Sequence, residues 1–117
     1  MNYVPHTLKP LRNYLVNQMR NPEMLQEVKL TLAALVEKSP GRAIEVRIPP
    51  YAAVQCGDGP KHTRGTPANV IEMDADTWLS LASGERTWAD AMAAGLISAS
   101  GVRADLTELL PLDKEHP

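Results

Sequence analysis

The chain has 117 residues and a mass of 12.8 kDa, with a net charge of −2, 44% hydrophobic and 22% charged residues. A chain of this mass buries about two-thirds of its surface on folding, which supports one hydrophobic core but not two, and its composition excludes an intrinsically disordered chain. The single cysteine excludes a domain built on internal disulfide bonds, and no apolar run approaches the ~20 residues that a membrane helix needs.

Two amphipathic helices are predicted in the first 40 residues. Over residues 7–20 apolar side chains recur at helical spacing, at Leu8, Leu11, Leu15 and Met19. A second helix starts after Asn21, which can act as an N-cap, and Pro22 suits its first position. The sequence Ser-Pro-Gly at 39–41 ends this helix. Its apolar stripe is formed by Met24 or Leu25, Val28, Leu32, Leu35 and Val36.

The hydrophobic period then changes from that of a helix to that of a strand. Apolar and other residues alternate over 42–48, which predicts a half-buried strand that Pro49-Pro50 ends. A second strand is predicted over 51–56, with Cys56 at its end. Residues 57–67 contain three glycines and two prolines and are predicted to form a loop, and a third strand follows over 68–73.

Short helices and one strand complete the chain. Asp74 can cap a helix that ends at Gly84, and Thr87 with Asp90 forms a variant of the capping box for a helix that closes at Gly95. A fourth strand is predicted over 96–101 and a last helix over 104–110. Helices segregated from a run of strands favour an α+β fold, with a mainly antiparallel sheet of four to five strands covered by several short helices.

We expect a single domain over residues 1–117. It would consist of an N-terminal helical segment (1–40), a unit of sheet and helices (41–112) and a tail (113–117). The start of the chain does not have the pattern of a signal peptide, so a soluble, cytoplasmic protein is expected.

Charge is unevenly distributed along the chain. Residues 1–64 carry nine Lys/Arg and five Asp/Glu, whereas residues 65–117 carry three and nine. A nucleic-acid-binding protein would show a denser basic cluster, so we expect no nucleic-acid partner. Lys9, Arg12 and Arg20 either face an anionic lipid surface or an acidic partner, or are scattered solvated charges.

Few motifs in the sequence carry catalytic chemistry. It has no phosphate-binding Gly-Lys loop and no dinucleotide fingerprint, and its three histidines lie far apart, so neither a metal site nor a cofactor is expected. The loop at 57–67 is the exception, because Arg64 could hold a carboxylate or phosphate with assistance from His62. The alternative is a solvated hairpin loop. Cys56 is either a reactive thiol, if a cation of this loop lies near it, or a small core residue.

The later helices supply a large apolar surface. Its members either pack on the sheet or line a cavity for an apolar ligand, and periodicity cannot separate the two because both need the same inward face. They are Trp78, Leu81, Trp88, Met92, Leu106, Leu109 and Leu110.

From residue 68 onward the sequence resembles the sterol carrier protein type 2 superfamily. Over residues 68–84 a strand leads into an Asp-rich helix cap, an aromatic residue, a Leu-x-Leu-like run and a closing glycine. The turn at 96–101 and the leucines of the closing helix also fit. Residues 46–56 and 62–67 are similar, more narrowly, to the bacterial sterol-carrier ortholog domain. Together these stretches cover about residues 22–112.

The resemblance implies a compact α+β fold in which sheet and helices enclose a tunnel for sterols, fatty acids or their thioesters. Related modules form the C-terminal part of thiol-dependent isomerases. The family's sheet usually has five strands, and here residues 57–67 occupy the place of the additional strand. A four-stranded sheet encloses a smaller cavity or none, which weighs against a large sterol as the ligand.

The leading hypothesis is a non-enzymatic carrier or binding module for a small hydrophobic or amphipathic ligand with an acidic head group. Its apolar part would contact the helix residues named above, with His62 and Arg64 near the polar end and Cys56 beside them. One alternative is an accessory module of a thiol-dependent isomerase that acts on a small carboxylate, with Arg64 as its clamp and a partner enzyme in trans. The other is a plain homodimerisation domain.

Overall fold

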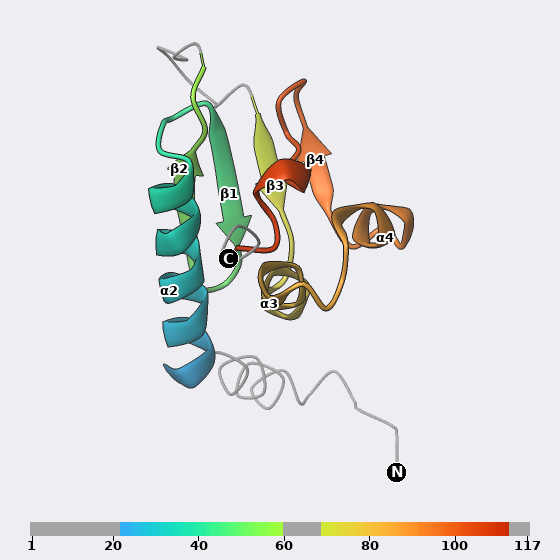
Figure 1. Ribbon diagram of the computed structural model, residues 1–117. Coiled ribbons are helices and arrows are strands. Elements are labelled where there is room, and N and C mark those ends of the chain that lie inside the picture. Colours follow the sequence, from blue (N-terminus) through green and yellow to red (C-terminus); the bar gives the residue numbers. More distant parts are fainter. Residues whose placement is uncertain (1–21, 60–68, 113–117) are drawn as a thin grey trace, which may run out of the picture.

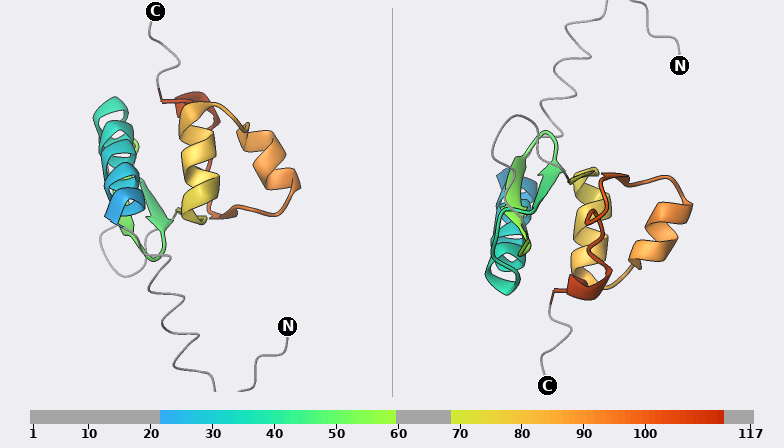
Figure 2. Two further views of the ribbon diagram at one scale, coloured as in Figure 1. Left: turned by 90° about the horizontal axis from the view of Figure 1, so that it is seen from below. Right: turned by 90° about the horizontal axis from the view of Figure 1, so that it is seen from above.

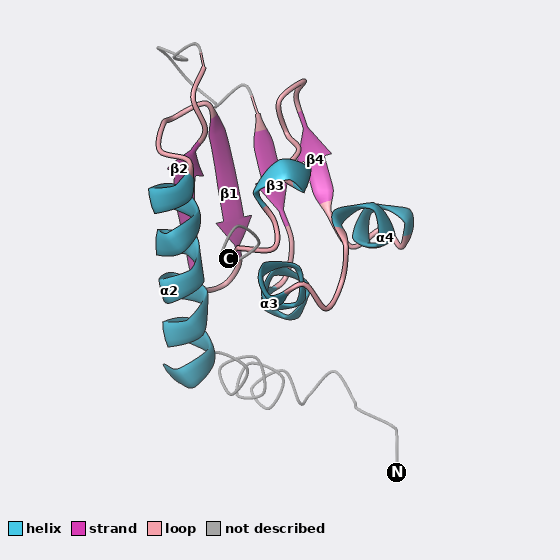
Figure 3. Ribbon diagram, viewed as in Figure 1, coloured by secondary structure: helices cyan, strands magenta, loops and turns pink. Residues whose placement is uncertain are grey.

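The computed structural model describes residues 22–59 and 69–112 of the chain (Figure 1). Figure 3 distinguishes its helices from its strands by colour. The predicted helix at 7–20, the tail at 113–117, and most of the loop at 57–67 lie outside the described residues. The elements, in chain order, are α2 (Pro22–Lys38), β1 (Ile44–Ile48), β2 (Ala52–Cys56), β3 (Val70–Glu72), α3 (Ala75–Ser83), α4 (Trp88–Ala93), β4 (Ser98–Ser100) and the 3₁₀ turn η2 (Thr107–Leu109).

The sheet has four strands in the order β2-β1-β3-β4 and is mixed. β1 pairs antiparallel with β2, β3 pairs antiparallel with β4, but β1 and β3 run parallel. We expected a mainly antiparallel sheet, but the parallel pairing of β1 with β3 at its centre makes the sheet mixed. β2 returns Cys56 to the level of Ile44, where β1 begins, and β3 starts beside Glu45 at the same end. Side-chain alternation carries no information about strand direction, so the sequence pattern could not distinguish these arrangements.

One face of the sheet forms the core. Ile44, Val46 and Ile48 of β1 point into it and are buried, whereas Glu45 and Arg47 lie on the opposite face and are partly exposed. The Arg47 guanidinium donates a hydrogen bond to Glu45 at 2.6 Å, and this bond, with the attraction between the two charges, raises the pKa of Arg47. This is the hydrophobic-in, polar-out alternation of a half-buried strand.

Buried residues of the three helices join those of the sheet in one core. α2 contacts β2 and α3, and Figure 2 shows α2, α3 and α4 in a row across the molecule. Val28, Leu32 and Leu35 are the buried residues of α2, as its apolar stripe predicts. None of the helices among the described residues is long and apolar enough to cross a membrane.

Both predicted caps of α3 and the predicted N-cap of α4 are confirmed, whereas α4 ends with Ala94 as its C-cap, one residue before the predicted Gly95, and Asn21 lies outside the described residues. The Asp74 carboxylate accepts the backbone N–H of Thr77 at 2.8 Å, and Gly84 ends α3 in the left-handed conformation with φ of 91°. The hydroxyl of Thr87 accepts the N–H of Asp90 at 3.1 Å. These local bonds satisfy backbone donors that have no partner inside the helix, which explains why short sequence signals located both ends of α3 correctly.

The last predicted helix is wrong in type and length. Instead of a helix over 104–110, the chain forms only the 3₁₀ turn Thr107–Leu109. The Asp105 carboxylate accepts both the backbone N–H and the hydroxyl of Thr107, at 2.8 and 2.5 Å. Such side-chain bonds to the neighbouring backbone compete with helix formation. The short turn still buries Leu106 completely in the core.

Candidate functional site

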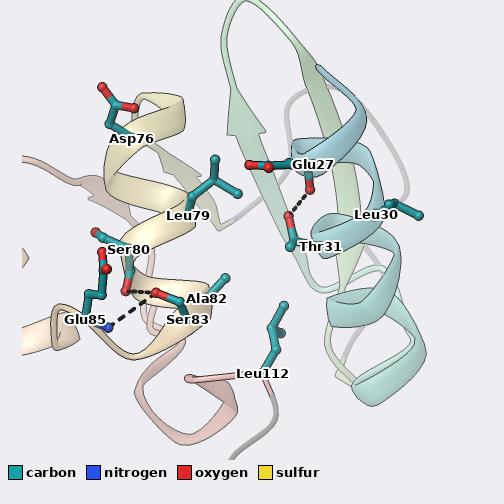
Figure 4. Close-up of a pocket in the computed structure, with 10 residues that line it drawn as sticks. All are labelled: Glu27, Leu30, Thr31, Asp76, Leu79, Ser80, Ala82, Ser83, Glu85 and Leu112. Atoms are coloured by element: carbon teal, nitrogen blue, oxygen red, sulfur yellow. Dashed lines mark hydrogen bonds between the residues drawn. The ribbon is translucent and has the colours of Figure 1, made fainter. Parts of the chain in front are cut away.

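A groove of about 630 Å³ runs between α2 and α3 (Figure 4). α2 forms one wall and α3 the other, and the two helices contact each other directly. The volume lies in the range of small-molecule sites. The groove is lined by Glu27, Leu30, Thr31, Asp76, Leu79, Ser80, Ala82, Ser83, Glu85 and Leu112.

A hydrogen bond between the two helices supports the floor of the groove. The indole Nε1 of Trp78 in α3 donates to the hydroxyl of Thr31 in α2 at 2.7 Å. Thr31 lies 2.7 Å from the carbonyl oxygen of Glu27 and 3.0 Å from that of Val28, and donates its own proton to these acceptors. Trp78 is fully buried, so its N–H needs this partner. The bond fixes the separation of the two walls and leaves the indole directly behind the lining.

Leu112 closes one end of the groove. Its backbone N–H donates to the carbonyl oxygen of Ala82, at the end of α3, at 3.0 Å. From the end of α2, the Lys38 ammonium donates to the carbonyl oxygens of Leu109, Pro111 and Leu112 at 2.9, 3.3 and 3.3 Å. The segment after η2 is therefore tied to both helices, and the Leu112 side chain lies between them in Figure 4.

Among the described residues, the charged groups that line the groove are all negative. Glu27 stands on α2, Asp76 lies in the first turn of α3, and Glu85 follows α3. All three residues are exposed, and no lysine, arginine or histidine of residues 22–59 and 69–112 lines the groove. An apolar floor with carboxylates around it favours an amphipathic ligand whose polar end is a cation or a hydrogen-bond donor.

The structure distributes the sequence-predicted site residues over several places. Cys56, Trp78, Leu81 and Leu106 are 0–1% exposed and form part of the core. Leu109 packs against this core from a partly buried position, and Met92 is exposed.

Two further predicted residues line a second, smaller pocket. Trp88 and Leu110 meet there with Arg86 around a volume of about 300 Å³. His62 and Arg64 lie outside the described residues. The structure thus brings Trp88 and Leu110 together, and Trp78 contacts the α2–α3 groove through Thr31.

The groove residues themselves were missed by sequence reasoning. Leu30 lies off the buried stripe of α2 and is 61% exposed, and Leu79 lies beside the fully buried Trp78 but is only partly buried. A large apolar residue on the outer face of an amphipathic helix is the signal that could have identified Leu30.

Cys56 lies at the end of β2, fully buried in the core. Burial raises the pKa of its thiol from an ordinary value of 9.0 to about 11. The nucleophile is the thiolate, so we expect the folded protein to resist alkylation at neutral pH.

The raised pKa of Cys56 predicts a loss of stability at alkaline pH. Below pH 9 the thiol keeps its proton in both states and contributes nothing. Between pH 9 and 11 only the unfolded state loses the proton, so the free energy of unfolding falls, by up to about 1.4 kcal/mol per pH unit. Urea unfolding from pH 8 to 11 measures this. Cys56→Ala, as control, should show a shallower slope, and equal slopes would contradict the prediction.

Comparisons with known proteins agree with this architecture. Within residues 22–59 and 69–112 no group of three or more His, Cys, Asp or Glu side chains could hold a metal ion. A search of curated proteins finds no match. The family model described as "Bacterial SCP ortholog" matches residues 20–112, which is most of the chain and includes both walls of the groove. The chain belongs to the bacterial SCP ortholog family and is a sterol carrier protein-like domain.

Proposed function

We propose that this protein is a non-enzymatic carrier of a small amphipathic, lipid-like ligand, which it binds in the groove between α2 and α3. The observation that carries the proposal is the groove itself, which has an apolar floor and a volume of about 630 Å³. The chain's membership of a family of sterol carrier-like domains supports it. Carrying a ligand needs no chemistry, only apolar burial worth about 25 cal/mol per Å² and a polar contact for orientation.

The proposed head group differs from the acidic one expected from sequence. That expectation depended on His62 and Arg64, which lie outside the described residues. Within the described lining the charged groups are the carboxylates of Glu27, Asp76 and Glu85. A carboxylate ligand would be repelled by them, whereas an amine or hydroxyl could donate hydrogen bonds to them. We therefore propose an amphiphile with a basic or hydroxylated head group.

Binding can be followed through Trp78, whose indole is bonded to Thr31 of the groove. The protein would be titrated with dodecylamine, dodecanol and lauric acid, each below the concentration at which it aggregates. We expect the amine to bind most tightly and the acid most weakly, with a change in tryptophan emission and one ligand per protein by native mass spectrometry. Only apoprotein with all three amphiphiles would overturn the proposal.

The site of binding is tested by Leu79→Asp, which introduces a carboxylate into the apolar lining of the groove. We expect dodecanol affinity to fall about tenfold or more, because the new carboxylate must be desolvated when the alkyl chain binds. Met92→Asp is the matched control, since Met92 is exposed on α4 and does not line the groove. Equal affinities for the two variants would place the ligand elsewhere on the protein.

A further inference from the structure

The smaller pocket, of about 300 Å³, lies between the turn that follows α3 and the chain at and after η2. Its volume is at the lower end of the range of small-molecule sites, so it suits a compact ligand. The pocket and the α2–α3 groove have no lining residue in common. Glu85 lines the groove, whereas its neighbour Arg86 lines the pocket, so the two cavities differ in charge.

Hydrogen bonds hold both walls of the pocket in place. On one side, the backbone N–H of Arg86 donates to the carbonyl oxygen of Ser80, in the last turn of α3, at 3.1 Å. On the other side, the carbonyl oxygen of Pro111 accepts a hydrogen bond from the Lys38 ammonium at 3.3 Å. The two walls approach each other at Gly84, where a Cβ atom would lie 3.4 Å from the ring of Pro111. The pocket is therefore formed before any ligand binds.

Two large apolar side chains of the lining are nearly buried. Trp88 is 8% exposed and Leu110 is 7% exposed, and both belong to the hydrophobic core as well as to the pocket. An apolar wall of this kind can cover the body of a ligand. It also keeps water away from one side of a bound charge, and this strengthens the attraction between that charge and a cation of the protein.

Three consecutive residues of the lining carry side-chain donors that bind no acceptor among residues 22–59 and 69–112. They are the Arg86 guanidinium, the indole N–H of Trp88, and the hydroxyl of Thr87, whose oxygen accepts the N–H of Asp90. No buried polar side-chain atom in the described part of the chain lacks a partner, so the N–H of Trp88 reaches the surface of the molecule. The indole N–H of Trp78, in contrast, is bonded to Thr31.

The charge of the pocket is positive. Arg86 is exposed, and no other charged residue of the described chain contributes to the lining. One nearby acceptor is already used, because the carbonyl oxygen of Thr87 accepts the N–H of Ala91 at 3.0 Å. A cavity with three unpaired donors and one cation favours an anion, and a guanidinium can bind a carboxylate through two parallel hydrogen bonds.

We propose that this pocket is a second binding site, which takes a compact apolar carboxylate. Arg86 holds the carboxylate group, and the apolar body of the ligand lies against Trp88 and Leu110. One guanidinium balances the single negative charge of such a ligand. The site stands independently of the proposed function, because it carries the opposite charge and shares no residue with the groove.

Naphthoate is a suitable probe, and its binding can be followed by ¹H–¹⁵N NMR of the full chain. The chain has two tryptophans, and the signal that is lost in Trp88→Phe identifies the indole N–H of Trp88. We expect naphthoate to shift this signal, and uncharged naphthamide of similar shape to bind about tenfold more weakly. A shift of the Trp78 signal alone would place the probe in the groove and overturn the proposal. Equal affinities of the two probes would also overturn it.

Arg86→Gln tests the role of the guanidinium. Naphthoate affinity should fall about tenfold, to that of naphthamide, because a charge-assisted bond is lost, whereas naphthamide affinity should not change. Arg42→Gln is the matched control, since Arg42 is exposed, carries the same charge and does not line the pocket. This control should bind naphthoate as the wild type does. Equal losses in the two variants would mean that net charge alone attracts the acid, and this would overturn the proposal.

Leu79→Asp separates this site from the proposed function. The substitution changes the groove and not the pocket, so it should weaken dodecanol binding and leave naphthoate binding at the wild-type level. Naphthoate binding by the wild type without any dodecanol binding supports the pocket and removes the carrier function. Dodecanol binding without any shift of the Trp88 signal by naphthoate removes the second site and leaves the carrier function intact.

Discussion

Replacing Gly41 with alanine is expected to destabilise the protein by about 3 to 4 kcal/mol. A Cβ atom at this position would lie 1.9 Å from the carbonyl oxygen of Gly57, and the φ of 142° is one that L-residues rarely adopt. The strained backbone costs about 1–2 kcal/mol. Moving Gly57 away would break its hydrogen bonds to Ser39 and Ala43, each worth about 1 kcal/mol.

Gly95→Ala is the matched control for this prediction. Gly95 also has a positive φ, of 73°, but a Cβ there would meet nothing within 4 Å. The Gly95→Ala variant should therefore lose only about 1 kcal/mol of stability, which is the cost of holding an alanine at a positive φ. Urea denaturation of both variants measures the difference. Equal losses of stability in the two variants would contradict the prediction, because the close approach of Gly41 to Gly57 would then not stabilise the start of β1.

Replacing Asn69 with alanine is expected to cost about 2 to 4 kcal/mol, because two backbone groups would each lose a partner. Asn69 is the residue directly before β3 in the sequence, and it is only 5% exposed. Its amide nitrogen donates to the carbonyl oxygen of Ala43 at 2.9 Å, and its amide oxygen accepts the N–H of Arg103 at 2.9 Å. One side chain thus joins the start of β1 to the loop after β4.

Gln55→Ala provides the control for Asn69, since it also removes a hydrogen-bonded amide. The Gln55 side chain accepts from the Arg42 guanidinium at 3.3 Å, but this pair is exposed, so water replaces the lost bond. The free energy of unfolding should therefore fall by no more than about 0.5 kcal/mol in the Gln55→Ala variant. The two variants would be compared by urea unfolding under the same conditions, and similar losses would mean that the buried bonds of Asn69 contribute little.

Elements defined by local chemistry were predictable from the sequence. α2, α3 and α4 were located through Pro22, Asp74, Gly84 and Thr87, because caps and glycine conformations depend on a few neighbouring residues. β1 and β2 were found through alternation over two-residue steps. The failure at 104–110 has the same origin: leucine spacing predicted a helix, and the bonds of Asp105 to Thr107 outweighed it.

The candidate site was not predictable in the same way. Its walls come from α2 and α3, which are separated in sequence by the β1–β2 hairpin and β3. The Trp78–Thr31 bond spans 47 residues, and Lys38 reaches Leu112 across 74. Contacts between residues so far apart in the sequence leave no local pattern. The sequence therefore indicated the large apolar residues as the site, and several of these are fully buried in the core.

The sequence by itself indicated the α+β class and the approximate limits of most helices and strands, because these depend on periodicity and capping, and its resemblance to known sequences indicated the family. Only the tertiary structure decided that β3 lies parallel to β1, and that Trp78 supports a groove rather than lining one. It also showed that the described groove carries carboxylates. The physical reason is that strand direction and the packing of two distant helices arise from contacts between remote residues, which side-chain periodicity does not encode.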